Sequence, residues 1–309
     1  MTINPPCVIL GCGFLGIPLA RQLFDRGFRV IIVDRNLPPF PISHRLSWIS
    51  LDISVSPDSL LDIIPRSSIV FHLLSTTVPA DVSVSFADEY HANISLSESI
   101  IRVCIALQVT KLIFASSASV YGESTSHSIQ YESSPLQPIS VHGLQKSTIE
   151  QLLYFYHFHS GIPISILRIS NPYGTFDKPS SRQGIIGILL SNYKYKKETT
   201  IYGLECIRDY IYIDDLIDSF ILIATSPSAP LFINVSSSIG ISTDSLLQSL
   251  QSFLPSKLFI SIRPRRPTDI RTSILSNSLL NQFIDVSNFH TIHDGLERTV
   301  ASFFQSPNT

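Results

Sequence analysis

Short apolar runs alternate with longer stretches of helical periodicity throughout the first half of the chain. Leu15, Leu19 and Leu23 recur at helical spacing, and Gly27 follows as a residue that ends helices. Residues 29–33 are rich in β-branched side chains, as buried strands are. Strands that alternate with helices need crossover connections, so the pattern predicts a doubly wound α/β fold with both faces of a parallel sheet covered. The expected strands are residues 7–10, 29–33, 48–51, 69–74, 111–115 and 164–168, and the expected helices are residues 14–26, 88–107 and 141–159.

The regular alternation of strand and helix patterns ends at about residue 170, after which loops lengthen and prolines and serines cluster. We interpret residues 1–170 as one domain and residues 171–309 as a smaller α/β lobe. Open parallel sheets bind ligands beyond the carboxyl ends of their strands, so we expect the smaller lobe to lie there and to hold the substrate. The elements expected in this lobe are strands near residues 200–202 and 231–235 and helices near residues 215–224 and 243–253.

Composition restricts the class of protein. Apolar residues make up 44% of the 309 residues, enough for a packed core, and 22 basic against 24 acidic residues give a net charge of −2. A charge so close to neutral argues against a nucleic-acid partner. No apolar run reaches the roughly 18 residues of a membrane-spanning helix and no signal-peptide pattern opens the chain, so we expect no membrane partner. The cysteines form no CxxC pair and predict reduced thiols in a cytoplasmic protein without a metal site: Cys7, Cys12, Cys104 and Cys206.

A glycine-rich turn with GxGxxG spacing follows the first expected strand and precedes a helix. In this motif the first glycine permits a tight turn, the second lets the backbone approach a pyrophosphate, and the third lets helix and strand pack closely. The unpaired amides and partial positive charge of the helix N-terminus hold the phosphates without a basic side chain. The turn therefore predicts a Rossmann-type dinucleotide site that includes Gly11, Gly13, Phe14, Leu15 and Gly16.

An acidic residue, Asp34, ends the second expected strand. Its carboxylate can accept hydrogen bonds from the ribose hydroxyls and would repel a 2′-phosphate, which favours NAD over NADP. Arg35 follows at once and keeps NADP open as an alternative. Asp52 and Ile53 follow the third strand, where an acidic side chain can bind the adenine amino group or else cap a turn. We include all four residues in the expected NAD site.

Two hydroxyl side chains, Ser116 and Ser117, stand at the carboxyl end of the strand expected at residues 111–115, where they can donate to a substrate oxygen. The strip FASSASVYG around them resembles the extended short-chain dehydrogenase/reductase family, and within it the nucleotide-sugar epimerases similar to UDP-glucose 4-epimerase. The resemblance covers nearly the whole chain, because further motifs follow in the family's order: VFHLLSTTVP, HANISLSESI, LRISNPYG, IYGLECIRDYIYIDD, FINVSSSIGIS and RPRRPTDI.

The resemblance implies a reaction and a set of site residues. In such enzymes NAD takes a hydride from sugar C4 and returns it to the other face, while a Tyr–Lys pair and a Ser or Thr handle the proton. Ser117 and Lys146 match catalytic positions. The relatives act on UDP- or GDP-linked sugars in surface-polysaccharide pathways and commonly form homodimers through two long helices, here those expected at residues 88–107 and 141–159. By position, the resemblance adds Leu74, Asn93, Ser116, Lys146 and Pro172 to the NAD site and assigns Asn171, Arg208 and Arg266 to the substrate.

One catalytic position departs from the family pattern, because His142 stands where the tyrosine of Tyr-x-x-x-Lys is expected. The i, i+4 spacing still places His142 and Lys146 on one helix face. A phenol has a pKa of about 10 and an imidazole one of about 6.5, and positive charge nearby lowers the imidazole pKa, so His142 can act as a neutral base. Its shorter side chain leaves a second hypothesis, a homologue that binds NAD and nucleotide sugar but is catalytically impaired.

The glycine turn departs from the family pattern as well. Leu10 stands where the family has its first glycine, and we expect a tighter turn.

The strip after Ser117 also selects among reactions. Relatives that dehydrate or decarboxylate nucleotide sugars carry acidic residues immediately before the VYG of this strip, whereas this chain has Ala118 and Ser119. Neither side chain can serve as a carboxylic acid, so the resemblance leaves an epimerase or a keto-sugar reductase. Because Asp34 favours NAD over a consumed NADPH, we predict an NAD-dependent nucleotide-sugar 4-epimerase.

Overall fold

The computed structural model describes residues 4–36, 43–75, 87, 90–123, 129–174, 184–266 and 269–305. Contacts divide the chain into two compact units, each built from segments that are not contiguous in sequence. The first unit is Met1–Val120, Ser140–Arg168 and Ile217–Ile233, and the second is Tyr121–Ile139, Ile169–Leu216 and Asn234–Thr309. The assignment of residues 1–170 to the cofactor and residues 171–309 to the substrate stays a prediction.

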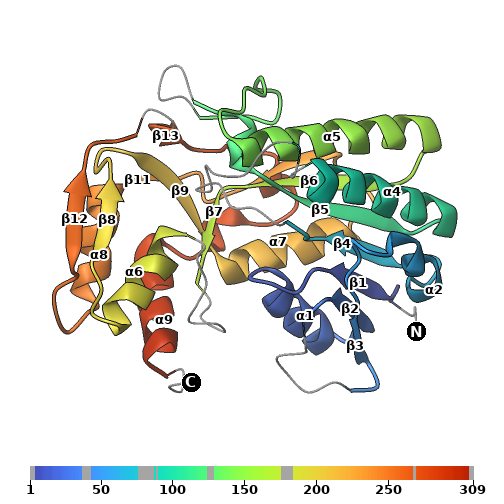
Figure 1. The fold of residues 1–309 in the computed structure, drawn as a ribbon, viewed down its shortest axis with the longest axis horizontal. Coiled ribbons are helices and arrows are strands. Elements are labelled where there is room, and N and C mark those ends of the chain that lie inside the picture. Colours follow the sequence, from blue (N-terminus) through green and yellow to red (C-terminus); the bar gives the residue numbers. More distant parts are fainter. Residues whose placement is uncertain are drawn as a thin grey trace. The chain divides into compact units, whose positions relative to one another are not determined.

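A seven-stranded sheet forms the centre of the first unit, with strand order β10-β6-β5-β4-β1-β2-β3 (Figure 1). The pairs β1–β2, β1–β4, β2–β3 and β4–β5 are parallel. This is the order of a doubly wound dinucleotide-binding fold, and its reversal point lies between β1 and β4. The predicted Rossmann-type α/β fold is therefore confirmed. The strands are β1 (Cys7–Leu10), β2 (Val30–Asp34), β3 (Leu46–Ser50), β4 (Ile69–His72), β5 (Lys111–Ser117), β6 (Ile164–Ile169) and β10 (Phe232–Val235).

Helices cover both faces of this sheet because successive strand residues point to opposite sides. Val8, Leu10 and Phe114 belong to an apolar cluster with buried residues of α2, α4 and α5, and Figure 1 shows α1 and α7 on the other side. The helices are α1 (Gly16–Asp25), α2 (Leu60–Ile63), α4 (Leu96–Leu107), α5 (Val141–Ser160) and α7 (Ile213–Thr225), with a π-helix at Tyr90–Ser95 and 3₁₀ turns at Pro57–Ser59 and Ala118–Val120.

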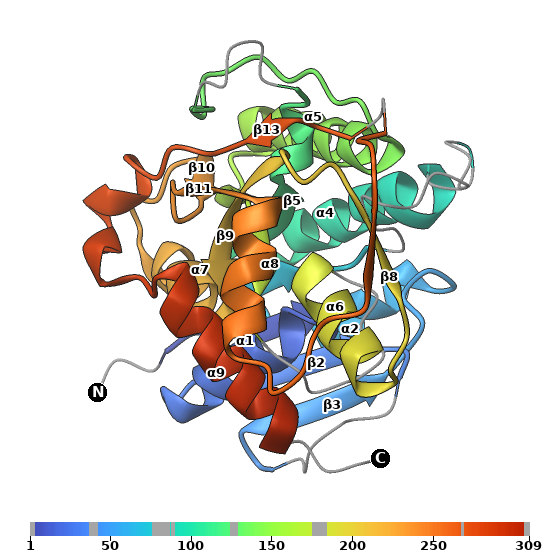
Figure 2. The same cartoon turned by 90° about the vertical axis from the view of Figure 1, so that its left-hand side faces the viewer.

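Strand β9 (Ile207–Tyr212) organises the second unit. It pairs in parallel with β7 and β13 and antiparallel with β11, while β8 and β12 form a separate parallel ribbon. Figure 2 shows the helices α6, α8 and α9 of this unit facing the viewer. Its other elements are β7 (Asn171–Tyr173), α6 (Ile185–Lys194), β8 (Thr199–Tyr202), β11 (Gly240–Ser242), α8 (Thr243–Ser252), β12 (Ile260–Arg263), β13 (Thr272–Ser273), 3₁₀ turns at Leu280–Gln282 and Val286–Asn288, and α9 (Ile292–Gln305).

Two elements expected in the smaller lobe contribute part of their residues to the first unit. The strand predicted at residues 231–235 is β10, which joins the large sheet beside β6, where the Ile166 amide donates to the Leu231 carbonyl at 2.6 Å. The preceding helix α7 enters the first unit from Ile217 onward. Periodicity predicts the type of an element, whereas its neighbours depend on which apolar surface it buries, so the sequence pattern did not place β10 in the large sheet.

The helix predicted to begin at Asp88 starts outside the described residues, and the part described begins with the π-helix at Tyr90. Within the described part of the chain, no helix has the length and apolar character needed to cross a membrane.

Candidate active site

The glycine turn joins β1 to α1 with a backbone that glycine alone adopts without strain. Gly11 has a φ of +94°, and a Cβ on Gly16 would lie 2.4 Å from the Gly11 carbonyl oxygen. At Gly13, by contrast, an added Cβ would meet no described atom within 4 Å. Among residues 15–19, all described, α1 has neither a side-chain cap nor an acidic side chain in its first turn. The turn thus presents open backbone and a helix N-terminus, which together suit a pyrophosphate.

Asp34 is held against this turn. One carboxylate oxygen accepts from the Cys12 amide at 2.7 Å, and the other accepts from the backbone and side-chain amides of Asn36, both at 2.8 Å. Each carboxylate oxygen has two lone pairs, so acceptor capacity remains for ribose hydroxyls. The predicted pairing of glycine turn and acidic residue is present, and Arg35 beside it is exposed. Asn36 is a contributor that the sequence analysis missed.

The remaining predicted adenosine contacts differ in character. Asp52 accepts from the hydroxyl and amide of Ser54 at 2.6 and 3.1 Å, and these bonds lower the pKa of the carboxyl. This is the turn-capping arrangement that the sequence left open. The Ile53 side chain is buried in the core, which leaves its backbone for any cofactor contact. Leu74 lies directly on the glycine turn, since a Cβ on Gly11 would come within 2.9 Å of its side chain.

A buried hydrogen-bond chain leads from β4 to Asn93 in the π-helix. The Ser97 hydroxyl donates to the Asn93 carbonyl at 2.6 Å, and His72 Nε2 lies 2.8 Å from the same hydroxyl. Because Ser97 has only one proton, Nε2 is the donor and Nδ1 carries a lone pair, for which no partner exists among the described residues. Burial first and the charge of Lys146 second lower the pKa of His72 to about 3, so the ring is neutral. The chain holds Asn93, which is 4% exposed, and its π-helix in place.

Ser116 is drawn into a second buried network. Its hydroxyl donates to Glu150, a fully buried carboxylate on α5. Glu150 is paired with Arg168, whose Nη2 lies 2.7 Å and Nε 3.1 Å from Oε2. Two charges so deeply buried need this satisfied geometry to be tolerated. The network ties α5 to β5 and β6, and the predicted contact of Ser116 with the cofactor stays a prediction.

Ser117 is arranged as a hydrogen-bond donor. Its oxygen accepts from the amide and the hydroxyl of Ser119 at 3.2 and 3.0 Å. With both donors aimed at this oxygen, the Ser117 proton points elsewhere and is available to a substrate oxygen. This role of Ser119 was not predicted from the sequence, where Ser119 served only as evidence that an acidic residue is absent from this position. The 3₁₀ turn that carries Ser119 contacts α5, the helix of His142 and Lys146.

Helix α5 begins where Ser140 accepts a hydrogen bond from the Gly143 amide at 3.1 Å. His142, Lys146 and Glu150 follow at four-residue intervals and are 8%, 4% and 0% exposed. Lys146 Nζ donates to the Ala115 carbonyl at 2.8 Å, which fixes the ammonium at the end of β5. Nζ also lies 4.6 Å from the centroid of the Phe114 ring. The predicted common face of His142 and Lys146 is therefore a buried face directed at the sheet.

His142 is neutral in this environment. Burial first, and then the charge of Lys146, lower its pKa from 6.5 to about 3. Its Nδ1 is buried and has no hydrogen-bond partner among the described residues. Desolvation and positive charge both oppose the imidazolium form. The decrease in the pKa of His142 that we expected from the sequence is thus present, and it makes His142 a weak base.

In the second unit, Asn171 and Pro172 lie on β7 beside β9. The Asn171 amide nitrogen donates to the Asp209 carbonyl at 2.8 Å, and Pro172 is in register with Ile211. Asp209 is fully buried and accepts from Ser237, Ser238 and Leu275, which ties β9 to two further segments. Nothing in the sequence predicted this structural role of Asp209, apart from its position in the family motif.

Both predicted phosphate-clamping arginines make contacts within the second unit. Arg208 donates to the carbonyls of Ile207 and Ile270. Arg266 donates through Nε and Nη2 to Asp269 at 2.9 and 2.8 Å, and its guanidinium lies 4.7 Å from the Tyr202 ring centroid. Burial raises the pKa of Asp269, but Arg266, with a smaller contribution from Arg208, lowers it overall. Both arginines therefore lie near Asp269.

The described residues contain no group of three His, Cys, Asp or Glu side chains placed to hold a metal ion.

Comparisons with known proteins agree with this geometry. Residues 7–235 match the NAD dependent epimerase/dehydratase family. Over 303 residues the chain is 27% identical to dTDP-4-dehydro-6-deoxyglucose reductase of Escherichia coli, with 94% of this chain and 95% of that protein covered. Over 322 residues it is 24% identical to UDP-glucose 4-epimerase of Azospirillum brasilense, covering 96% and 90%. The solved structure of UDP-glucose 4-epimerase with UDP-glucose from Thermotoga maritima has a TM-score of 0.86 at 25% identity, covering 97% and 99%. The chain therefore belongs to the NAD-dependent epimerase/dehydratase family and is an enzyme whose cofactor is NAD.

Proposed function

We propose that this enzyme is a nucleotide-sugar 4-epimerase in which His142 takes the place of the family tyrosine. The observation that carries the proposal is the buried face of α5, where His142 and Lys146 stand one turn apart and α5 contacts the turn that follows Ser117. Asp34, bound to the glycine turn, supports NAD rather than NADP as the nucleotide. The substrate in this proposal is a UDP- or GDP-linked sugar.

Each residue has a defined task in the proposed reaction. Bound NAD supplies a reversible hydride acceptor for a sugar carbon. Ser117 donates a hydrogen bond to the hydroxyl oxygen on that carbon, and His142 accepts the hydroxyl proton as the carbon is oxidised and returns it when the carbon is reduced. Lys146, fixed on the Ala115 carbonyl, stabilises negative charge on the oxygen. The nucleotide and its diphosphate are held by Asn171, Arg208 and Arg266.

Two alternatives are each favoured by one observation. The lowered pKa of His142 favours a homologue that binds NAD and nucleotide sugar but turns over slowly, because protonating His142 is unfavourable. The Escherichia coli relative, a dTDP-4-dehydro-6-deoxyglucose reductase, favours a keto-sugar reductase. Asp34 opposes an NADPH-dependent version of that reaction.

A single set of incubations separates the three. The purified enzyme is incubated with NAD and a panel of UDP- and GDP-sugars, and in parallel with NADH or NADPH and a nucleotide-linked 4-keto-sugar, and products are followed by NMR. An equilibrating pair of C4 epimers without net consumption of reduced nucleotide supports the epimerase. Stoichiometric oxidation of NADPH or NADH by a 4-keto-sugar supports the reductase. Bound NAD with no turnover of any sugar supports the impaired homologue and overturns the proposal.

We also propose a homodimer formed through α5 and its neighbour α4. One stripe of α5 is exposed and largely apolar, including Leu144, Phe155 and Phe158, which are 43%, 52% and 75% exposed. Large exposed aromatic side chains at helical spacing indicate a covered interface. Phe155→Ser with Phe158→Ser should give a monomer by light scattering, and an unchanged mass would contradict the proposal. A role in surface-polysaccharide synthesis and a cytoplasmic location stay predictions.

A further inference from the structure

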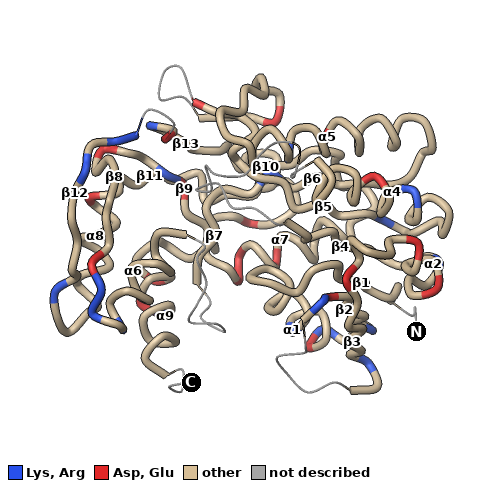
Figure 3. The backbone as a smooth tube through the Cα atoms, in the orientation of Figure 1, with Lys and Arg blue, Asp and Glu red and all other residues tan. Residues whose placement is uncertain are grey.

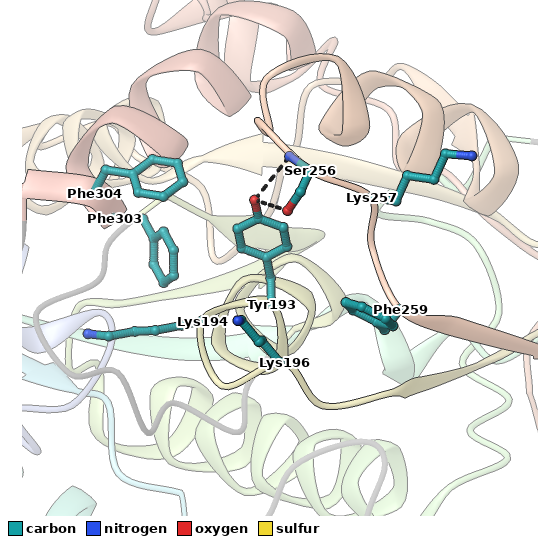
Figure 4. Close-up of a pocket in the computed structure, with 8 residues that line it drawn as sticks. All are labelled: Tyr193, Lys194, Lys196, Ser256, Lys257, Phe259, Phe303 and Phe304. Atoms are coloured by element: carbon teal, nitrogen blue, oxygen red, sulfur yellow. Dashed lines mark hydrogen bonds between the residues drawn. The ribbon is translucent and has the colours of Figure 1, made fainter.

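A pocket of about 630 Å³ lies in the second unit, and none of its lining residues belongs to the predicted cofactor or substrate sites. Three segments form it: the end of α6 with the turn after it, the loop after α8, and the last turn of α9 (Figure 4). The lining residues are Tyr193, Lys194, Lys196, Ser256, Lys257, Phe259, Phe303 and Phe304.

The pocket wall is largely aromatic and carries one pair of hydroxyl groups, on Tyr193 and Ser256. Phe303 is buried, and Phe304 meets the Tyr193 ring edge-on, with centroids 6.5 Å apart. The Tyr193 hydroxyl lies 2.7 Å from the Ser256 hydroxyl and accepts from the Ser256 amide at 3.2 Å (Figure 4). Phe259 and Phe304 are 58% and 54% exposed, so parts of both side chains are accessible to a ligand.

The charge of the lining is positive only. Lys194, Lys196 and Lys257 contribute three cations, and no carboxylate is among these lining residues, all of which are described. Figure 3 shows Lys and Arg positions near the starts of β8 and β12. Glu198, which directly precedes β8, is exposed and is not among the lining residues. In a protein with a net charge of −2, such a cluster is a local feature rather than a consequence of composition.

From these features we propose that the pocket binds a nucleoside phosphate. The three lining lysines attract an anionic phosphate or pyrophosphate group through their combined charge, and exposed aromatic side chains can stack on a base. Figure 4 shows Lys194 and Lys257 extending to opposite sides of Tyr193, so the lysines surround the pocket rather than converge on one phosphate. The hydroxyl pair of Tyr193 and Ser256 suits a base edge or a ribose hydroxyl, whereas an acyl chain would leave it unsatisfied. The volume is in the usual range for small-molecule sites. A lipid and a simple inorganic anion each match only part of this lining.

The pocket is separate from the substrate residues of the same unit. β8 and β12 run in parallel, beginning at Thr199 and Ile260 beside the pocket and ending at Tyr202 and Arg263. Arg266 stacks on Tyr202, at the far end of this ribbon. Four residues of strand span about 10 Å, so the pocket and Arg266 lie at opposite ends of this ribbon.

Cysteine protection tests the proposal with a local readout. The four native cysteines are all buried, so Ser256→Cys introduces one exposed thiol at the pocket. We expect uridine diphosphate to slow its alkylation at least fivefold at saturation. Lys194→Gln with Lys196→Gln should raise the half-protecting concentration roughly 5- to 30-fold, as expected for the loss of two exposed charge pairs. Ser252→Cys, on the exposed side of α8, is the matched control and should be unaffected.

Three outcomes would overturn the proposal: no protection of the Ser256→Cys thiol, equal protection by inorganic phosphate, or equal protection of the Ser252→Cys control. Photo-crosslinking of the unaltered chain with an azido-nucleoside diphosphate gives an independent measurement in case Ser256→Cys disturbs Tyr193. Adducts on peptides that contain Tyr193 or Phe304 support the site. Adducts confined to the glycine turn or to Arg208 and Arg266 refute it.

Discussion

Replacing His142 with tyrosine restores the family's acid/base group at a position where the structure weakens the histidine. Burial and the charge of Lys146 lower the pKa of His142 from 6.5 to about 3. At about 1.4 kcal/mol per pKa unit, protonating this ring costs about 5 kcal/mol more than protonating a free imidazole. A phenol has the opposite charge pattern, because its basic form is an anion that Lys146 stabilises.

The expected result is a faster enzyme. General acid–base groups contribute roughly 10²- to 10⁴-fold to rates, and a base weakened by several pKa units loses part of that range. We therefore expect His142→Tyr to raise kcat for epimerisation by roughly 10- to 100-fold. Because wild-type His142 is already neutral above about pH 4, its titration should produce no inflection in kcat between pH 5 and 9.

The assay is product formation by NMR at saturating substrate, over pH 5 to 9. His142→Phe is the matched control, since it fills similar space to tyrosine without a proton-carrying group. Thermal melts and NAD affinity show whether each variant keeps the fold and the cofactor. The reasoning is refuted if wild-type kcat has an inflection near pH 6.5 that His142→Phe abolishes. It is also refuted if His142→Tyr is no faster than His142→Phe with fold and NAD affinity intact.

Three further predictions concern the buried groups around the site. The folded-state pKa of His72, about 3, lies below its unfolded value of 6.5, so the unfolded chain binds more protons below pH 6.5 and stability falls as pH decreases. In His72→Gln, the decrease in the free energy of unfolding between pH 7 and pH 5 should be about 2 kcal/mol smaller than in the wild type, measured by urea unfolding. An unchanged pH dependence would contradict this. Glu150→Gln removes the carboxylate charge that pairs with the buried Arg168 guanidinium and should destabilise the protein by about 3–5 kcal/mol in urea unfolding, with Glu98→Gln, whose side chain is 43% exposed, as a near-neutral control. Asp34→Ala should weaken NAD binding about tenfold and shift the preference toward NADP by calorimetry, because it removes both an acceptor and the repulsion of a 2′-phosphate.

The predicted cofactor half of the site rests on local signals in the sequence. The glycine turn, the end of β2 and the helix of His142 and Lys146 are each determined by residues close in the chain. Ser119 and Asn36 were missed although they lie within two residues of predicted site positions, because a short polar side chain has no pattern that distinguishes a partner from a surface residue. The pairing of Glu150 with Arg168 required the contact between α5 and β6, which no local pattern predicts.

The sequence by itself determined the order and type of the elements, the dinucleotide turn and the family of the enzyme. These depend on periodicity, on glycine backbone freedom and on short motifs, all of which act within a few residues. The tertiary structure decided that β10 returns to the large sheet and that His72 and His142 are buried and neutral near Lys146. It also decided that three separate segments form a cationic aromatic pocket. Those properties depend on burial and charge between residues distant in the chain, and hydrophobic burial specifies no partner until the whole fold is formed.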